Sequence, residues 1–169
     1  MFYEDVFKAF HEKNIRYLVI GAIAMNLHGA PRMTADLDIL SDMSRENLLR
    51  VIETLGELGY RPRLPVSATD LLDSERRQRW IQEKRLIAFT FFHPKIQFQE
   101  VDLLLQSPVS FDEAYQRKMI VAVESVNIPV ISVDHLIQMK HSTGREQDKA
   151  DIQVLERIKR LRSEGKTNG

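Results

Sequence analysis

Hydrophobic residues recur along this chain with two different spacings, which predict alternating helices and strands. Apolar residues three or four positions apart indicate the buried face of a helix, whereas short β-branched runs indicate buried strands. The helices predicted in this way are Phe2–Lys13, Ala22–His28, a segment between a capping Ser44 and Gly59, Thr69–Lys84, Phe111–Arg117, Val133–His141 and Glu146–Arg162. The predicted strands are Arg16–Ile20, Leu37–Leu40, Leu86–Phe92, Phe98–Leu105, Ile120–Val123 and Ile128–Ile131.

This order of elements predicts an α+β fold, a central mixed β-sheet flanked by helices. His93-Pro94-Lys95 separates two strands that we expect to form a hairpin, and Thr143 and Glu146 have the spacing of a helix capping box. We expect one domain over residues 1–169, with its core at about 16–105, C-terminal helices at about 133–162 and a tail, 163–169, that frays.

The first candidate chemistry is the sequence Asp36-Leu37-Asp38 at the start of a predicted strand. Residues two apart on a strand point to the same face, so Leu37 enters the core while both carboxylates stand on the other side. Two like charges held together favour a cation between them, and Mg²⁺ prefers such oxygen ligands. The plainer alternative is a solvated strand edge with two exposed acids.

A second acidic strand adds weight to the metal interpretation. Gln99-Glu100-Val101-Asp102 runs into an apolar segment, which puts Glu100 and Asp102 on one face of a strand. If this strand lies beside the first, three carboxylates can hold two metal ions, as in phosphoryl-transfer sites. We expect Asp102, rather than Glu100, to be the third ligand because Glu100 lies nearer the strand start.

Other candidate residues surround these acids. Gly21 joins a strand to a helix, whose N-terminal N–H groups can bind phosphate, although a plain tight turn explains the glycine equally well. Arg32 could reach phosphate or pair with Asp36, and Thr34 flanks the acids. Lys140 could approach a nucleotide from the C-terminal helices; the alternative is a salt-bridge network with nearby acids on an exposed helix.

The motifs Val19-Ile20-Gly21-Ala22 and Arg32-Met33-Thr34-Ala35-Asp36-Leu37-Asp38-Ile39 resemble the signature of the nucleotidyltransferase fold shared with DNA polymerase beta. Lys140, Gly144-Arg145 and Asp148…Asp151 are similar to a narrower group, the small nucleotidyltransferases related to the AbiEii-like abortive-infection toxins. The resemblance covers Arg16 to about Leu155.

This resemblance implies that Asp36, Asp38 and Asp102 are catalytic metal ligands for Mg²⁺, with two ions in the full site and Mn²⁺ as a substitute. Gly21, Ala22, Arg32, Thr34 and Lys140 would contact the nucleotide. Ala22 stands where the family commonly has a second Gly or a Ser, so it offers phosphate no hydroxyl. The implied reaction moves a nucleoside monophosphate from an NTP such as ATP to a hydroxyl on a protein, an RNA or a small molecule.

Composition excludes several other classes of protein. Twenty-four basic and 24 acidic residues give a net charge of zero, which argues against a protein that coats nucleic acid. The absence of cysteine excludes disulfide scaffolds, thiolate zinc sites and cysteine catalysis. The N-terminus lacks the features of a secretory signal and no apolar run could span a membrane, so we expect a cytoplasmic protein.

Three hypotheses remain from the sequence. The first is the Mg²⁺-dependent nucleotidyltransferase, whose partners would be an NTP and an unidentified hydroxyl acceptor. The second is a catalytically inactive nucleotide-binding module, or the partner of an antitoxin or neighbouring gene product, on the same fold. The third is a structural dimerisation domain; an oligomer is compatible with all three.

Overall fold

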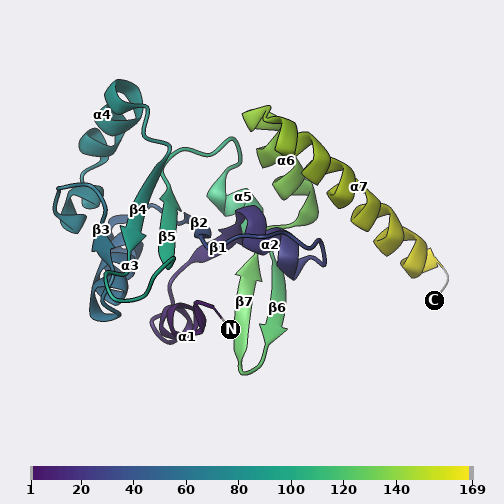
Figure 1. The fold of residues 1–169 in the computed structure, drawn as a ribbon, viewed down its shortest axis with the longest axis horizontal. Helices are drawn as coiled ribbons and strands as arrows, with labels where there is room; N and C mark the ends of the chain where they lie inside the picture. The colour runs from purple at the N-terminus through teal and green to yellow at the C-terminus, as the bar shows by residue number, and fades with distance from the viewer. Residues whose placement is uncertain (1, 168–169) are drawn as a thin grey trace.

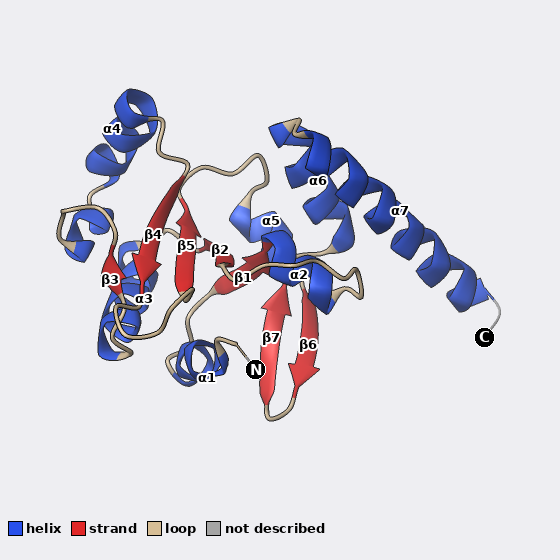
Figure 2. Cartoon of the chain, viewed as in Figure 1, coloured by secondary structure: helices blue, strands red, loops and turns tan. Residues whose placement is uncertain are grey.

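The computed structural model describes residues 2–167, and within these residues seven strands form one mixed sheet with helices on both faces (Figures 1 and 2). The strands are β1 (Tyr17–Ile20), β2 (Leu37–Ser41), β3 (Arg61–Pro62), β4 (Ala88–Phe92), β5 (Glu100–Leu104), β6 (Met119–Val123) and β7 (Val126–Val130). The helices are α1 (Glu4–Glu12), α2 (Gly21–Leu27), α3 (Arg45–Glu57), the 3₁₀ helix η1 (Ala68–Leu72), α4 (Ser74–Lys84), α5 (Phe111–Gln116), α6 (Val133–Thr143) and α7 (Glu146–Thr167). The predicted α+β class is confirmed.

Strand β2 lies at the centre of the sheet, whose order is β3–β4–β5–β2–β1–β7–β6. It runs antiparallel to β1 and parallel to β5. The hairpin predicted around His93-Pro94-Lys95 is confirmed as the antiparallel pair β4–β5. The two strands that carry the candidate acids, β2 and β5, are therefore direct neighbours although they are far apart in the sequence.

The two faces of the central strands differ in burial. Leu37, Ile39, Val101 and Leu103 are fully buried on one face. Alternating residues of β4 and β5, among them Asp102, point to the other face and are only partly buried. This alternation is the period of two expected of a strand that buries one side.

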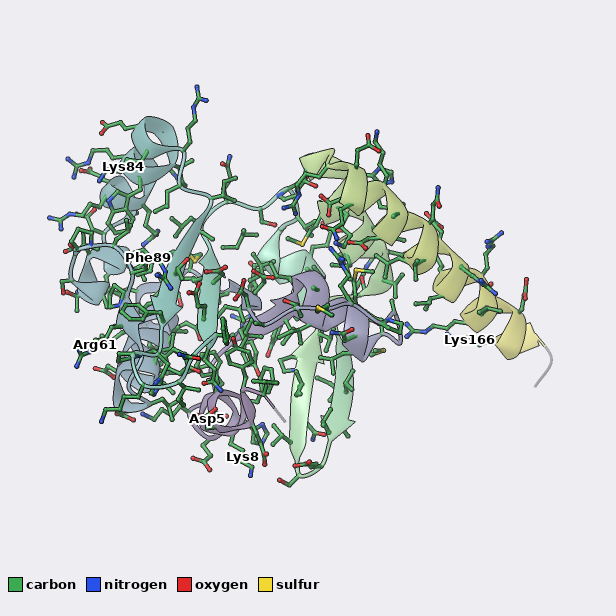
Figure 3. All side chains as sticks on the ribbon, in the orientation of Figure 1. Asp5, Lys8, Arg61, Lys84, Phe89 and Lys166 are labelled. Atoms are coloured by element: carbon green, nitrogen blue, oxygen red, sulfur yellow. The ribbon has the colours of Figure 1, made fainter. Side chains whose placement is uncertain are left out.

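Helices α1 and α4 cover the fully buried face. Phe10 of α1 packs edge-on against Tyr17 with ring centroids 5.0 Å apart, and Trp80 of α4 stacks on Phe89 at 5.5 Å. Tyr17 pairs with Ser41, and Phe89 pairs with Leu103, so both aromatic residues share the face of Leu37 and Leu103. Figure 3 shows Phe89 below α4. Helix α4, with its three arginines Arg76, Arg77 and Arg79, therefore lies on the side of the sheet away from the candidate acids.

The helix predicted over Thr69–Lys84 is divided in two. Asp73 ends η1 and caps α4, because its carboxylate accepts hydrogen bonds from the N–H groups of Glu75 (3.0 Å) and Arg76 (3.2 Å). The Ser44 cap of α3 is confirmed: its hydroxyl accepts from the Asn47 N–H at 3.4 Å. The short strand β3 was not predicted.

The C-terminal helices also differ from the prediction. The capping box is wrong: the Thr143 hydroxyl bonds to the Asp148 carboxylate, and Gly144, at φ +63°, ends α6. Helix α7 continues to Thr167, so residues 163–167, expected to fray, are helical, whereas residues 168–169 lie outside the described residues. No helix in residues 2–167 is long and apolar enough to cross a membrane.

Candidate functional site

Asp38 and Asp102 lie opposite each other on adjacent strands. The parallel pairing of β2 with β5 aligns Leu37 with Val101 and Asp38 with Asp102, and Asp36 directly precedes β2. The expected adjacency of the two acidic strands is therefore present. Asp38 and Asp102 stand on the face opposite the buried leucines, where carboxylates can meet a ligand.

Gly21 leaves the space that the Asp38 side chain occupies. A Cβ atom at Gly21 would lie 2.2 Å from Oδ2 of Asp38, a distance that non-bonded atoms do not tolerate. Gly21 also has a φ of +66°, which favours glycine. Because Ile20 pairs with Asp38 across β1 and β2, the turn into α2 lies directly over this carboxylate. The glycine thus has a steric reason as well as the predicted role in phosphate binding.

Burial and neighbouring carboxylates disfavour the ionisation of Asp38 and Asp36. Burial, followed by repulsion from Asp102 and Asp36, raises the pKa of Asp38 to about 7, although Lys140 and Arg145 act in the opposite direction. Burial and repulsion from Asp102 also raise the pKa of Asp36. Nearby positive charge therefore does not offset burial and the repulsion from neighbouring acids at Asp38 and Asp36, and an added cation would relieve that cost.

Two residues that the sequence did not single out adjoin the acids. The Thr90 hydroxyl of β4 donates to Oδ1 of Asp102 at 2.5 Å, which fixes the direction of that carboxylate. Arg63 forms an ion pair with Glu100, and its guanidinium lies 5.0 Å from the centre of the Phe92 ring. Glu100 is therefore already paired with Arg63, which is consistent with the choice of Asp102 as the third acid. Only the β4–β5 register, which no local motif encodes, brings Thr90 to Asp102.

Lys140 belongs to a second cluster of charges between α6 and α7. Its ammonium group lies 2.8 Å from Asp151 and 3.3 Å from Asp148, and both of these aspartates are buried. Arg32 lies 3.4 Å from Asp151, and Arg145 lies 2.8 Å from Asp148. Arg32 therefore pairs with Asp151, not with Asp36. The cluster is the salt-bridge network considered as an alternative, but the side chains of Lys140 and its two aspartates are largely buried rather than exposed, whereas Arg145 is 74% exposed.

The remaining predicted residues flank the acids. Ala22 lies in the first turn of α2, directly after Gly21. Thr34 is half-buried in the loop before β2, with its hydroxyl 3.4 Å from the Asp36 carbonyl oxygen. The side chain of Asn26 holds this loop from α2 by two hydrogen bonds to the backbone of Arg32, of 2.6 and 2.8 Å. Helix α2 thus positions both the glycine turn and the loop that leads to Asp36.

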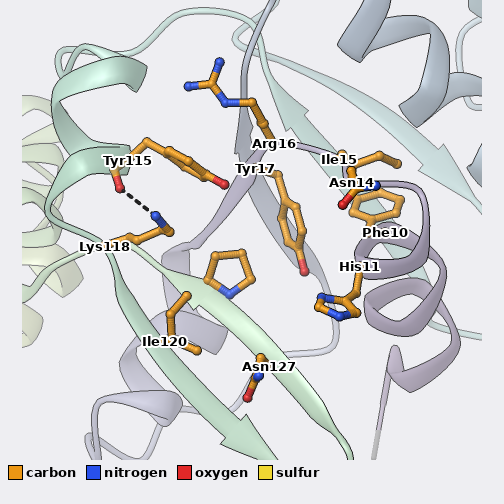
Figure 4. Close-up of a pocket in the computed structure, with 11 residues that line it drawn as sticks. Phe10, His11, Asn14, Ile15, Arg16, Tyr17, Tyr115, Lys118, Ile120 and Asn127 are labelled. Carbon is orange, nitrogen blue, oxygen red and sulfur yellow. Dashed lines mark hydrogen bonds between the residues drawn. The ribbon is translucent and has the colours of Figure 1, made fainter.

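A cavity of about 520 Å³ lies elsewhere, between α1, β1, α5 and the β6–β7 hairpin (Figure 4). Tyr17, Tyr115 and Lys118 are among its lining residues. Tyr17 and Asp38 point to opposite faces of the sheet, because Tyr17 lies three residues from Ile20, the register partner of Asp38. The carboxylate site therefore lies on the other face of the sheet from this cavity.

The acids fit a divalent cation that is shared with a substrate. Within residues 2–167 no three His, Cys, Asp or Glu side chains are gathered closely enough to hold a metal ion by themselves. Mg²⁺ is commonly held by one or two carboxylates and completed by substrate phosphates and water. The aligned pair Asp38 and Asp102, whose first carboxylate is accommodated by Gly21 and has a raised pKa, matches that donor set.

Comparison of the sequence with protein families assigns the chain to a known group. The model of DUF6036, described as a nucleotidyltransferase of unknown function, matches residues 4–164. The chain belongs to this family. No curated protein sequence matches this nucleotidyltransferase.

Solved structures support the same fold. A lincosamide antibiotic adenylyltransferase, LnuA, determined with lincomycin bound, is 16% identical and has a TM-score of 0.59; the match covers 90% of this chain and 93% of that one. ANT(2")-Ia in complex with adenylyl-2"-tobramycin is 12% identical, with a TM-score of 0.56 and coverage of 97% and 94%. An antigenic nucleotidyltransferase-like protein from Paracoccidioides brasiliensis is 14% identical, with a TM-score of 0.53 and coverage of 92% and 72%. At these identities the likeness concerns the nucleotidyltransferase fold.

Proposed function

We propose that this chain is a Mg²⁺-dependent nucleotidyltransferase that moves a nucleoside monophosphate from an NTP to a hydroxyl group of a small molecule. One observation carries the proposal: Asp38 and Asp102 face each other on adjacent strands, beneath a glycine turn, with their charge uncompensated. The lincomycin and tobramycin ligands of two similar structures support a small-molecule acceptor. ATP is the first donor to test, because both of those proteins are adenylyltransferases or hold an adenylylated product.

Each residue has a defined part in this proposal. Asp36, Asp38 and Asp102 hold the divalent ions, which when bound neutralise triphosphate charge and lower the pKa of the acceptor hydroxyl. The backbone at Gly21 and Ala22 accepts the phosphates. The acceptor oxygen bonds to the α-phosphorus while the bond to the β-phosphate breaks, so that pyrophosphate leaves.

Asp102 lies on the side of the site where the acceptor would bind. The face of β4 and β5 around it is only partly buried, and we place the acceptor there, against Thr90 and Phe92. Thr90 occupies one oxygen of the Asp102 carboxylate. The other oxygen is left to receive the proton of the acceptor hydroxyl or to bind the ion beside it.

The positive charges have a supporting part in the same scheme. Arg32, Lys140 and Arg145 outnumber their partners Asp148 and Asp151 by one charge. Lys140 and Arg145 lower the pKa of Asp38, so this cluster acts electrostatically on the carboxylate site. We propose that its excess charge attracts the triphosphate and that Thr34 contacts the nucleotide from the neighbouring loop.

The test is transfer of label from each α-³²P NTP, with Mg²⁺, to the small-molecule, protein and RNA fractions of a cell extract. We expect label in the small-molecule fraction and release of pyrophosphate, both lost in Asp38→Asn and in Asp102→Asn. Asp112→Asn, which changes an aspartate 80% exposed on α5, is the matched control and should retain activity. Transfer that survives in the Asp38→Asn/Asp102→Asn double variant would falsify the proposal.

Other outcomes separate the alternatives. Label in the protein or RNA fraction would keep the reaction but replace the acceptor. Metal-independent NTP binding without release of pyrophosphate would favour the catalytically inactive module, including the antitoxin-partner form that the AbiEii-like resemblance implies. That narrower resemblance stays a prediction, because the matching family is described only as nucleotidyltransferases of unknown function.

A further inference from the structure

Tyr3 connects the N-terminal segment to both acidic strands. Its side chain is almost fully buried, at 1% exposure. The phenol oxygen lies 2.5 Å from the carbonyl oxygen of Ala35 and 2.8 Å from that of Glu100, so its single proton is shared between them. The same oxygen accepts the N–H of Glu100 at 3.0 Å. One hydroxyl thus joins three backbone groups on two different segments.

The positions of these backbone groups relate Tyr3 to the site. Ala35 directly precedes Asp36, and Glu100 begins β5 two residues before Asp102. The register of β2 with β5 decides whether Asp38 faces Asp102, because a slip of one residue would turn one of the carboxylates to the other face. The bonds of Tyr3 lie at the start of both strands, where such a slip or a local separation would begin.

The backbone of Tyr3 adopts a rare conformation to reach this position. Its φ is +63° and its ψ is 17°, the left-handed region that few residues other than glycine occupy. In this conformation Tyr3 precedes α1 and its carbonyl oxygen accepts the Phe7 N–H at 3.0 Å. Strained backbone of this kind persists where surrounding contacts over-determine it. Burial, the largest cause, raises the pKa of Tyr3 to about 12, so the hydroxyl keeps its proton and remains a donor at neutral pH.

We propose that Tyr3 is a positioning residue of the nucleotidyl-transfer site, one that holds Asp36 and Asp102 in place through the backbones of Ala35 and Glu100. The inference rests on the proposed function, since it assigns those acids to metal binding. It extends the site to the segment before α1, which contributes no candidate ligand. Groups that orient metal ligands tune metal affinity even when they touch no metal, and Tyr3 would do so through the backbone rather than through the ligands themselves.

The chain contains two matched tyrosines for a controlled test. Tyr60 is buried at 3% exposure, and its hydroxyl donates one bond of 2.8 Å to the side chain of Gln99 rather than to the backbone of an acidic strand. Tyr17 is buried at 2% exposure, and its hydroxyl has no hydrogen-bond partner within the described residues. Tyr→Phe changes at positions 3, 60 and 17 therefore remove similar hydroxyl groups with different connections.

The experiment measures two properties of the full-length wild type and the three variants, at a temperature where all are folded. The first is the affinity for Mn²⁺ in the presence of an unreactive ATP analogue, measured by calorimetry. The second is hydrogen exchange of individual amides by NMR in the absence of metal. For Tyr3→Phe we expect about tenfold weaker Mn²⁺ binding. We also expect faster exchange at Asp36–Asp38 and Glu100–Asp102, beyond any change elsewhere in the sheet.

Tyr60→Phe and Tyr17→Phe should retain wild-type Mn²⁺ affinity and wild-type exchange in these segments. If Tyr3→Phe loses stability but keeps both properties, Tyr3 acts only as a structural bond and the inference is overturned. If the wild type itself fails to bind Mn²⁺, the proposed function fails, and the exchange data still decide whether Tyr3 holds the two strands. Faster exchange spread evenly over the sheet would also overturn the inference.

Discussion

The molecule has two groups of aspartates whose surroundings are opposite in character. Asp148 and Asp151 are buried between α6 and α7 against Lys140, Arg32 and Arg145. Asp38 and Asp102 face each other on the sheet, with Thr90 as a hydrogen-bond partner and no cation within ion-pair distance among residues 2–167. The first group has its counter-charges built into the fold, whereas the second lacks them.

The pKa values follow this difference. Burial alone would raise the pKa of Asp148, but hydrogen bonds from Thr143 and Arg145 and the charge of Lys140 lower it. Burial and neighbouring acids raise the pKa of Asp38 to about 7. Burial alone therefore does not decide the role of an acid: the paired aspartates have partners that the fold needs them to keep, and the unpaired ones are available to a ligand.

The largest effect is expected from removing a charge in the paired group. Asp148→Asn leaves Lys140 and Arg145 with one carboxylate fewer in a buried cluster, which should lower the free energy of unfolding by about 3–5 kcal/mol at pH 7. Urea unfolding followed by circular dichroism measures it. Because the pKa of Asp148 is lowered in the folded state, this loss should shrink as pH falls below about 4. A change below 1 kcal/mol at neutral pH would contradict a built-in ion cluster.

The same change in the unpaired group should have the opposite sign. Asp38→Asn removes a carboxylate whose folded pKa is raised above its unfolded value, so the folded wild type is penalised increasingly as pH rises from about 4 through about 7. Without metal at pH 8, the variant should be more stable by on the order of 1–3 kcal/mol, allowing for partial exposure. The gain should vanish near pH 4. Urea unfolding across this pH range measures this gain in stability. A variant that is less stable than the wild type at pH 8 would contradict the raised pKa of Asp38.

Divalent cations should act on the two groups differently. Mg²⁺ with an unreactive ATP analogue binds the folded state of the wild type and should raise its stability by roughly 1–3 kcal/mol at saturating concentrations. Chelation by EDTA should reverse the increase, and Asp38→Asn should show none of it. Thermal unfolding with and without Mg²⁺ measures the difference. Asp148→Asn, which leaves the carboxylate site intact, should still show an increase, and Asp112→Asn, which changes an exposed aspartate on α5, is the matched control.

The smallest effect concerns the bond that orients Asp102. Thr90→Val keeps the shape of the side chain but removes the donor at 2.5 Å from Asp102. We expect a loss of about 1 kcal/mol in unfolding free energy and a few-fold weaker Mn²⁺ binding. Thr69→Val, which removes the bond between the exposed hydroxyls of Thr69 and Ser67, is the control and should leave Mn²⁺ binding unchanged. Equal behaviour of the two variants would remove Thr90 from the site.

Much of the fold and the acidic pair was predictable from local pattern. The alternation in Asp36-Leu37-Asp38 and in Glu100-Val101-Asp102 determines which side chains are buried, because the strand period is two. The β4–β5 hairpin followed from two apolar runs separated by a turn. These features depend on neighbours in the sequence, which a pattern can describe.

Features that depend on the tertiary structure were not predictable. Thr90 reaches Asp102 only through the β4–β5 register, and Tyr3 reaches Glu100 across most of the chain. The Thr143–Glu146 spacing suggested a capping box, but the buried carboxylate of Asp148 bonds the Thr143 hydroxyl instead. Arg32 pairs with Asp151 rather than with the nearby Asp36, since α7 folds back against its loop. For Thr143 and Arg32 the packing of α7 thus provides a different partner from the one that the local spacing suggested.

In the proposed site, Asp38 belongs to a carboxylate cluster that has no cationic side chain paired with it and that binds a divalent ion. The most direct measurement is a ¹³C-NMR titration of the Asp38 carboxyl carbon, with and without Mg²⁺ and an unreactive ATP analogue. We expect a pKa of about 7 in the free protein and a decrease of at least about one unit when the ion is added. An ordinary aspartate pKa near 4 that Mg²⁺ leaves unchanged would contradict the proposed site.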